Sequence, residues 1–367
     1  MANNQAKKSI LIFSTAYFPL VGGAEVAVKE ITQRLPDWQF DMITAKIQSG
    51  LAKFERIGNI NVYRVGFGLG FDKFLLPFLG LLKAKKLEQK NHYNLTWSIM
   101  ASYGGFLGLF FKCSHLKKPW LLTLQEGDPP KDILRKVGIF KKWFYQIFQK
   151  ADYFQAISSF LYNWAMKMGA RSGEIVPNGV DVEKFKVQNP KSKKEKVIIT
   201  VSRLVKKNGI DDLIKAVAQL DIKLLILGEG PDEKKLKRLA ERLNLKEKVL
   251  FLGHIQYNDL PKYYSSADVF VRPSLSEGLG NVFLEAMACG VPIIGTPVGG
   301  IPDFLEDRKT GLFCQVNNPQ DIAKKIKEIL ENDELQKSMV NNGLKLVKDK
   351  YSWDKISLKM EKIFKKL

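Results

Sequence analysis

The sequence has few of the features that define specialised classes of protein. Its three cysteines, Cys113, Cys289 and Cys314, are an odd number without paired metal spacing, so neither a disulfide framework nor a zinc site is indicated. Its longest apolar stretch covers nine residues, 74–82, and contains Pro77, whereas a membrane-spanning helix needs about 20. We therefore expect a protein of a reducing cytoplasm without a transmembrane helix.

A signal peptide is not expected either. The first apolar segment, residues 10–13, is followed at once by Ser14 and Thr15, so it is too short for the apolar core of a signal peptide. A buried first strand explains this segment better.

Acidic residues are scarce relative to basic ones. The formal net charge is +20, and residues 1–180 hold 24 Lys and Arg against 12 Asp and Glu. This excess indicates an anionic partner: an anionic membrane surface, a phosphorylated acceptor or nucleic acid. Nucleic acid is the weakest of the three, because no helix-turn-helix, zinc or RNP-like pattern accompanies the charge.

The chain does contain a regular alternation of strands and helices. The strand at 10–13 is followed by a turn with Gly22 and Gly23 and then by apolar residues at helical spacing. The pattern restarts with strands at 197–201 and 224–227, after a lysine-rich linker at about 177–195. Such alternation predicts parallel sheets covered by helices, and 367 residues fit two domains.

The most informative segment is 274–299, S-L-S-E-G-L-G-N-V-F-L-E-A-M-A-C-G-V-P-I-I-G-T-P-V-G. Its glycine-rich turn runs into a helix, so backbone N–H groups at 279–282 are expected to form an anion site at the helix N-terminus. Glu285, placed in the first turn of that helix, is suited to bind a vicinal diol such as a ribose, and Glu277 a second polyol. Acidic residues near a helix start also occur for structural reasons alone.

The Glu-x7-Glu spacing, the following A-M-A-C-G-V-P-I-I and the turn G-T-P-V-G-G-I-P-D closely resemble the donor-site signature of retaining GT-B glycosyltransferases of family 4. This resemblance implies an α/β protein with two Rossmann-like domains, each a doubly wound parallel sheet, that face a central cleft. It implies an N-terminal acceptor-binding domain at 1–177 and a C-terminal nucleotide-sugar-binding domain at 178–351. The amphipathic segment 352–367 is then a helix that returns to the first domain.

The resemblance extends to loops that follow other predicted strands. Arg203 matches a family arginine and is expected to neutralise the leaving diphosphate. The family lysine five positions later is Asn208 here, so its role is assigned to Lys207, with Lys206 as the alternative. Gly228 and Gly230 resemble a G-x-G turn of the family near the nucleotide, although such a turn is also typical of a purely structural tight turn. The expected donor-binding residues are Gly22, Gly23, Arg203, Lys207, Gly228, Gly230, His254, Ile255, Glu277, Gly278, Leu279, Gly280, Asn281, Val282 and Glu285.

The expected catalytic residues are Arg203, Lys207, Glu277 and Gln125. Gln125 follows the strand W-L-L-T-L, where many family members have a histidine beside the donor sugar. This difference removes a side chain that exchanges a proton near neutral pH. Glu126 and Asp128 are the neighbouring carboxylates that can take the proton of the acceptor instead.

Two stretches combine apolar residues with lysines, at 71–90 and 131–150. Either can lie on an anionic bilayer. The interpretation as core helices with lysines that reach the solvent is preferred. The membrane interpretation would favour a lipid-linked acceptor and a peripheral place on the cytoplasmic face.

The resulting hypothesis is a retaining hexosyltransferase that uses a UDP-sugar as first choice, or GDP-mannose as second, and acts on a saccharide or lipid-linked acceptor. Polysaccharide or glycolipid assembly is the process that the resemblance implies. No metal or other cofactor is expected, because no Asp-x-Asp motif stands in the family context. The alternatives are a nucleotide-sugar hydrolase or epimerase, a dinucleotide-dependent oxidoreductase and a non-catalytic membrane-binding protein.

Overall fold

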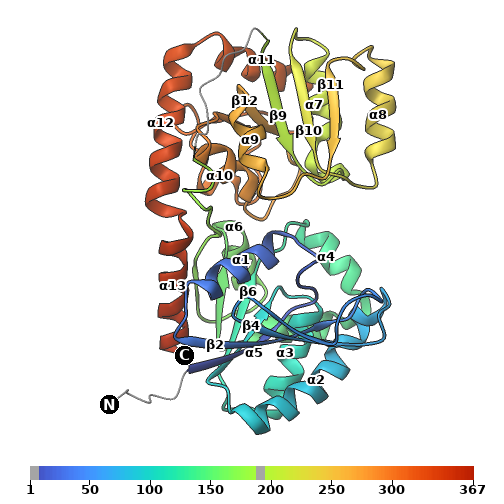
Figure 1. Cartoon of the computed structure of the whole chain (residues 1–367), viewed down its shortest axis with the longest axis vertical. Helices are drawn as coiled ribbons and strands as arrows, with labels where there is room; N and C mark the ends of the chain where they lie inside the picture. The colour runs from blue at the N-terminus through green and yellow to red at the C-terminus, as the bar shows by residue number, and fades with distance from the viewer. Residues whose placement is uncertain (1–7, 187–194) are drawn as a thin grey trace. The chain divides into compact units, whose positions relative to one another are not determined.

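The computed structural model describes residues 8–186 and 195–367. The chain forms two compact units (Figure 1). The first comprises the residues up to Asn178 together with Trp353–Leu367, and the second comprises Gly179–Ser352. Both units are α/β and built on a largely parallel sheet, as the fold prediction states. The predicted linker includes residues 187–194, which lie outside the described residues.

The first unit contains an eight-stranded sheet in the order β3-β4-β2-β1-β5-β6-β7-β8. The strands are β1 (Lys8–Phe13), β2 (Trp38–Ala45), β3 (Phe54–Ile57), β4 (Ile60–Val65), β5 (Leu95–Ile99), β6 (Trp120–Leu124), β7 (Tyr153–Ala156) and β8 (Gly173–Ile175). β1 lies in the middle of the sheet, and its residues 10–13 are fully buried because helices cover both faces. The alternation of strands and helices fails at β3 and β4, which form an antiparallel hairpin with no helix between them.

Two helical layers cover this sheet. The helices are α1 (Gly23–Gln33), α2 (Asp72–Asn91), α3 (Tyr103–Ser114), α4 (Pro130–Val137), η1 (Gly138–Phe140), α5 (Lys141–Lys150), α6 (Ser159–Lys167) and α13 (Trp353–Lys366). Ile10 and Ile12 of β1 pack with α1 and α13, whereas Leu11 and Phe13 point to the other face and pack with α2 and α3. Alternate side chains of β1 therefore belong to two separate hydrophobic cores, one on each face of the sheet.

The C-terminal helix α13 belongs to the first unit, as predicted. Its Phe364 ring lies against Trp38 and Trp97, with ring centroids 5.6 and 5.2 Å apart. At its start, Asp354 accepts a hydrogen bond of 2.7 Å from Arg34 of α1. The helix thus completes the core on one face of the first sheet.

The second unit contains a six-stranded parallel sheet in the order β11-β10-β9-β12-β13-β14. The strands are β9 (Val197–Val201), β10 (Lys223–Leu227), β11 (Val249–Gly253), β12 (Val269–Arg272), β13 (Ile293–Gly295) and β14 (Leu312–Phe313). The helices are η2 (Lys206–Asn208), α7 (Ile210–Val217), α8 (Glu233–Arg242), α9 (Leu260–Ser265), α10 (Asn281–Ala288), η3 (Ile301–Asp303), α11 (Pro319–Leu330) and α12 (Asp333–Lys350).

The amphipathic stretch 131–150 is not one helix, and its first part is not a core helix. Gly138, with φ 57°, separates α4 from η1 and α5. Phe144 and Ile147 of α5 are buried, whereas α4 has no buried residue and Ile139 is 90% exposed. The helical spacing continues across Gly138, which is why the sequence pattern alone does not locate the break.

Candidate functional site

The site is set by the topology of the second sheet. β9, the first strand of this unit, has β10 on one side and β12 on the other. The sheet therefore grows from β9 first in one direction, through β10 and β11, and then in the opposite direction, from β12 onward. In doubly wound sheets ligands bind outside the carboxyl ends of the strands at this switch point. The loops after β9 and β12 carry Arg203 and Glu277, so both lie at the switch point.

These two loops are joined through their backbones. The N–H of Leu275 donates a hydrogen bond of 2.6 Å to the carbonyl of Lys207. Gly209 has φ 66°, and a Cβ at this position would lie 2.1 Å from the carbonyl oxygen of Pro273. Only glycine fits there, because both the left-handed backbone and the close approach exclude a side chain.

Asn208, at the position of the expected lysine, is a buried structural residue. Its Nδ2 donates to the carbonyl of Arg203 at 2.7 Å, and its Oδ1 accepts from Arg272 at 3.1 Å. The side chain of Lys207 is half-buried, whereas that of Arg203 is exposed and has no ion pair in the described part of the chain. Asn208 therefore fixes the loop that presents Arg203.

Glu277 is held by Arg272, the last residue of β12. Arg272 Nη2 lies 2.7 Å from Glu277 Oε2, and both side chains are about seven-eighths buried. Within residues 8–186 and 195–367, Arg272 Nε and the nearby Ser274 Oγ are buried without a hydrogen-bond partner, and the buried Glu277 Oε2 has only its ion pair with Arg272. Buried polar groups normally have partners, so these incompletely paired atoms at the end of β12 and in the loop after it favour a place where ligand hydroxyls bind.

The backbone of Glu277 is fixed by the turn 296–300. The N–H of Gly300 donates to the carbonyl of Glu277 at 3.2 Å. Gly299 has φ 57°, and a Cβ there would lie 1.7 Å from the same carbonyl oxygen. This contact explains why the G-T-P-V-G-G turn accompanies the two glutamates.

We expect Gly299→Ala to lower the free energy of unfolding by roughly 3 kcal/mol, since it adds left-handed strain to a steric clash. Urea unfolding measures this loss. Gly50→Ala is the control, because a Cβ at Gly50 meets no atom within 4 Å and should leave stability unchanged. Equal stability of both variants would contradict the assigned contact.

The helix α10 offers an open N-terminus next to Glu277. It begins at Asn281 after Gly280, which has φ 95° and, as a glycine, cannot cap the helix with a side chain. Gly278 and Leu279 are buried, and Asn281 and Val282 are half-buried. Uncapped N–H groups and the positive end of the helix dipole together favour a bound anion such as a phosphate.

The sequence analysis places Glu285 in the first turn of α10, and this placement is wrong. Glu285 is the fifth residue of the helix and lies in its second turn. The side chain is 8% exposed, and Tyr264 Oη donates to its Oε2 at 2.9 Å. Burial raises the pKa of Glu285 to about 7, and the Tyr264 hydrogen bond and the charges of Arg272 and Lys184 lower it in part. The carboxylate therefore changes charge near neutral pH.

We expect Tyr264→Phe to move the pH dependence of donor binding upward. The hydrogen bond from Tyr264 favours the charged form of Glu285, so its loss raises the pKa above about 7. Affinity for a nucleoside diphosphate should then reach its plateau at higher pH than in the wild type, as measured by calorimetry between pH 6 and 9. Glu285→Gln should remove the difference between the two proteins, and an unchanged midpoint in Tyr264→Phe would contradict the assignment.

The remaining residues of the second unit that the sequence predicts to bind the donor follow two other strands, β10 and β11. A Cβ at Gly228 or Gly230 would lie 2.1 Å from Ser202 O or 2.3 Å from Leu204 O, respectively, so both glycines are needed for close backbone packing against the Arg203 loop. His254 is exposed, and its N–H donates to Glu229 Oε1 at 3.2 Å, while Ile255 is half-buried. These residues follow β10 and β11, on one side of the switch point.

The first unit has a switch point of its own, because β1 has β2 on one side and β5 on the other. Gly22 caps α1, and its N–H already donates to Glu25 Oε2 at 2.8 Å; Gly23 is the first residue of α1. Gln125, after β6, accepts from Asn178 at 3.0 Å. The N-terminus of α1 thus holds the carboxylate of Glu25 at the two glycines that the sequence analysis expects to bind the donor.

Glu126 is the most perturbed carboxylate of this switch point. Its Oε1 accepts from the N–H of Ala101 at 2.6 Å, whereas its buried Oε2 has no partner in the described residues. Burial raises its pKa to about 7, with the backbone hydrogen bonds acting in the opposite direction. Asp128, by contrast, is paired with Lys136 at 2.7 Å.

Comparison with known proteins decides the family. The model "Glycosyltransferase Family 4" matches residues 21–184, and the model "Glycosyl transferases group 1" matches residues 181–346. The chain is a family 4 glycosyltransferase of the GT-B fold. The donor of a family 4 glycosyltransferase is a nucleotide-sugar, and the family membership favours a transferase over a dinucleotide-dependent oxidoreductase.

Relatives of this glycosyltransferase span its length. N-acetyl-alpha-D-glucosaminyl L-malate synthase of Bacillus anthracis is 29% identical, over 95% of this chain and 94% of its own. A GDP-mannose-dependent monoacylated alpha-(1-6)-phosphatidylinositol monomannoside mannosyltransferase of Corynebacterium glutamicum is 34% identical, over 49% of this chain and 53% of its own. The structure of Anabaena HepE in complex with UDP and glucose superposes with a TM-score of 0.81, 20% identity and coverage of 98% and 100%.

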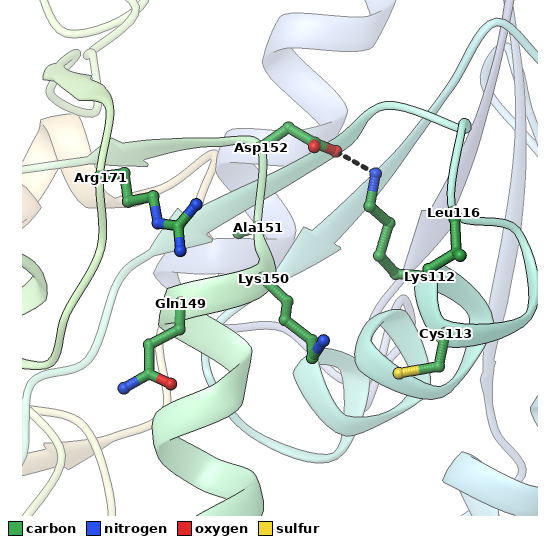
Figure 2. A pocket seen from close by; sticks show the side chains of 8 residues that line it. All are labelled: Lys112, Cys113, Leu116, Gln149, Lys150, Ala151, Asp152 and Arg171. Carbon is green, nitrogen blue, oxygen red and sulfur yellow. Dashed lines mark hydrogen bonds and ion pairs between the residues drawn. The ribbon is translucent and has the colours of Figure 1, made fainter.

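A pocket of about 350 Å³ in the first unit of the glycosyltransferase lies elsewhere (Figure 2). It is lined by Lys112, Lys150 and Arg171, and by Asp152, whose Oδ2 pairs with Lys112 and accepts from the N–H of Trp120. Trp120 begins β6, so the pocket lies at the amino ends of the strands and is separate from the switch point. Among the described residues, no cluster of His, Cys, Asp and Glu is suited to a metal ion.

Arg272 and Tyr264 are the site residues that the sequence reasoning did not identify. A cation at the end of the buried strand V-F-V-R was a usable signal for Arg272. The sequence gives no such signal for Tyr264, because an aromatic residue in a short helix is typical of a hydrophobic core. No helix among the described residues is long and apolar enough to cross a membrane.

Proposed function

We propose that this glycosyltransferase moves a hexosyl group, with retention of the anomeric configuration, to a saccharide or lipid-linked saccharide. A UDP-sugar is the first choice of donor and GDP-mannose the second, since relatives or structural neighbours are named with each. The observation that carries the proposal is the joined pair of loops at the switch point, which presents Arg203, Glu277 and the open end of α10 together.

The assigned chemistry begins at the diphosphate. Arg203, Lys207 and the N-terminus of α10 stabilise the charge that builds on the departing phosphate, so no metal is assigned to this step. Glu277 Oε2 accepts from hydroxyls of the donor sugar, and the Glu285 carboxylate accepts from the ribose. Retention follows when the acceptor approaches on the face from which the phosphate leaves.

The role of the base that takes the proton from the acceptor hydroxyl is assigned to Glu126, not to Gln125 or Asp128. Its pKa of about 7 and its unpartnered Oε2 suit a group that takes a proton near neutral pH. The amide of Gln125, which is bonded to Asn178, is assigned a positioning role.

A donor screen with product analysis tests the function. UDP, GDP, ADP and their sugars are titrated calorimetrically with EDTA present, and the best donor is then incubated with saccharide and lipid-linked acceptors. Proton NMR of the new linkage reads the anomeric configuration. Inversion, or a requirement for added metal, would overturn the mechanism.

The alternative of a hydrolase or epimerase is separated by the same experiment without acceptor. Release of free sugar or formation of an epimer at the rate of donor consumption would favour it. Consumption that depends on acceptor favours the transferase.

A further inference from the structure

The solvent side of α2 and the loop before it carry large apolar side chains, which we call the apolar face. Their exposed fractions range from 48% to 72%, and they are Phe67, Leu69, Phe71, Phe74, Phe78 and Leu82. The three members on the helix, Phe74, Phe78 and Leu82, are spaced by four residues and so share one side. The opposite side, with Leu76 and Leu87, is buried in the core shared with α3. Figure 1 shows α2 beside α3. Phenylalanines on the solvent side of a helix whose other side is already buried indicate an interaction surface.

The loop is held in a fixed conformation that exposes these side chains. The fully buried Asp72 accepts three backbone hydrogen bonds at its Oδ2, from Phe67 and Gly68 at 2.7 Å and from Leu69 at 3.1 Å. Gly68 has φ 93°, and a Cβ there would lie 2.8 Å from the Cα of Ser49. Phe67 and Leu69 therefore face the solvent from an ordered loop.

Beyond the apolar face, the exposed surface of α2 becomes cationic. Lys85, Lys86 and Lys90 are exposed, and none has an ion pair within the described part of the chain. The remaining acid of the helix, Glu88, is buried and paired with Lys118 at 2.7 Å. The solvent side of α2 thus combines an apolar half with a positive half and carries no carboxylate.

We propose that the apolar face and these three lysines dock on an anionic lipid bilayer. The phenylalanines enter the interface between headgroups and acyl chains, and the lysines lie at the lipid phosphates. Charge selects this occupant: a second copy of the chain, with net charge +20, would oppose like charges. This docking does not require the catalytic activity. Its consequence, that the acceptor is bound from the bilayer, rests on the proposed function.

Sedimentation with vesicles of phosphatidylglycerol and phosphatidylcholine tests the docking, with pure phosphatidylcholine as the neutral comparison. The wild type should bind the anionic vesicles and lose binding in high salt. The variant K85E/K86E/K90E should bind them at least roughly 100-fold more weakly. F74S/F78S should lose binding to a similar degree, because it removes the inserted rings.

Leu358→Ser is the matched control, since Leu358 is 58% exposed on α13, on the other face of the sheet, and should not affect binding. Donor affinity of all variants, measured calorimetrically, should equal that of the wild type, which separates this test from that of the proposed function. Equal vesicle binding by all variants, or none by the wild type, overturns the proposal. So does a wild-type dimer in ultracentrifugation that F74S/F78S converts to a monomer without any vesicle binding.

Discussion

Replacing Arg203 by alanine should lower kcat by roughly 10²- to 10³-fold, the size of effect seen when one donor to a developing anion is lost. The guanidinium is exposed at the switch point and, in the described residues, has no ion pair of its own to satisfy. Its charge is therefore available to the departing diphosphate. The carbonyl of the same residue is bonded to the buried Asn208, which fixes where the side chain begins.

Steady-state kinetics of sugar transfer measures this effect, and two variants interpret it. Arg203→Lys keeps the charge but loses bidentate bonding, so its kcat should fall between those of the wild type and the alanine variant. Arg242→Ala removes an exposed arginine at the end of α8 and should leave kcat unchanged. A wild-type kcat in Arg203→Ala would show that the assigned charge stabilisation comes from elsewhere.

Most of the fold follows from local patterns. The run at 197–201 predicts a strand with the bounds that the structure gives to β9, because five residues are too few for a buried helix and all five are β-branched. The hairpin of β3 and β4 was missed because an edge strand, half of it exposed, has no continuous apolar run.

The exposure of the apolar face could not be read from the sequence. The spacing of its phenylalanines fits a core stripe equally well, and only the packing of α2 decides which side is buried. Leu76, two residues from the exposed Phe74 and Phe78, is fully buried. The preference for a core helix was therefore wrong for Phe74, Phe78 and Leu82.

The two glutamates of the site were found from the sequence, while their partners were not. Glu277 and Glu285 stand in one recognisable segment, and their roles stay predictions. The ion pair with Arg272 and the hydrogen bond from Tyr264 depend on how β12, α9 and α10 pack. Asn208, which the pattern presents as a missing lysine, has its function in loop geometry that only the structure reveals.

Replacing Glu285 by alanine should weaken binding of the donor's nucleoside diphosphate by roughly 100-fold or more, because each charge-assisted hydrogen bond contributes about 1.5–3 kcal/mol.

The buried Glu285 carboxylate also affects the stability of the free protein. The pKa of Glu285, about 7, lies above that of a glutamate in the unfolded chain. The stability that Glu285 contributes is therefore complete below the unfolded pKa and is lost as the pH rises through 7. Glu285→Gln should therefore lose less stability than the wild type between pH 5 and 8.

The matched nucleoside, which has the ribose but no phosphate, makes the assignment specific. Glu285→Ala should weaken the nucleoside and its diphosphate by the same factor, whereas Arg203→Ala should weaken only the diphosphate. Calorimetry with both ligands and both variants gives the four affinities, and Glu306→Ala, which removes an exposed carboxylate, is the control for charge alone. If Glu285→Ala spared the nucleoside and weakened only the diphosphate, the carboxylate would act through the phosphate-binding loop, and the ribose would have to bind elsewhere.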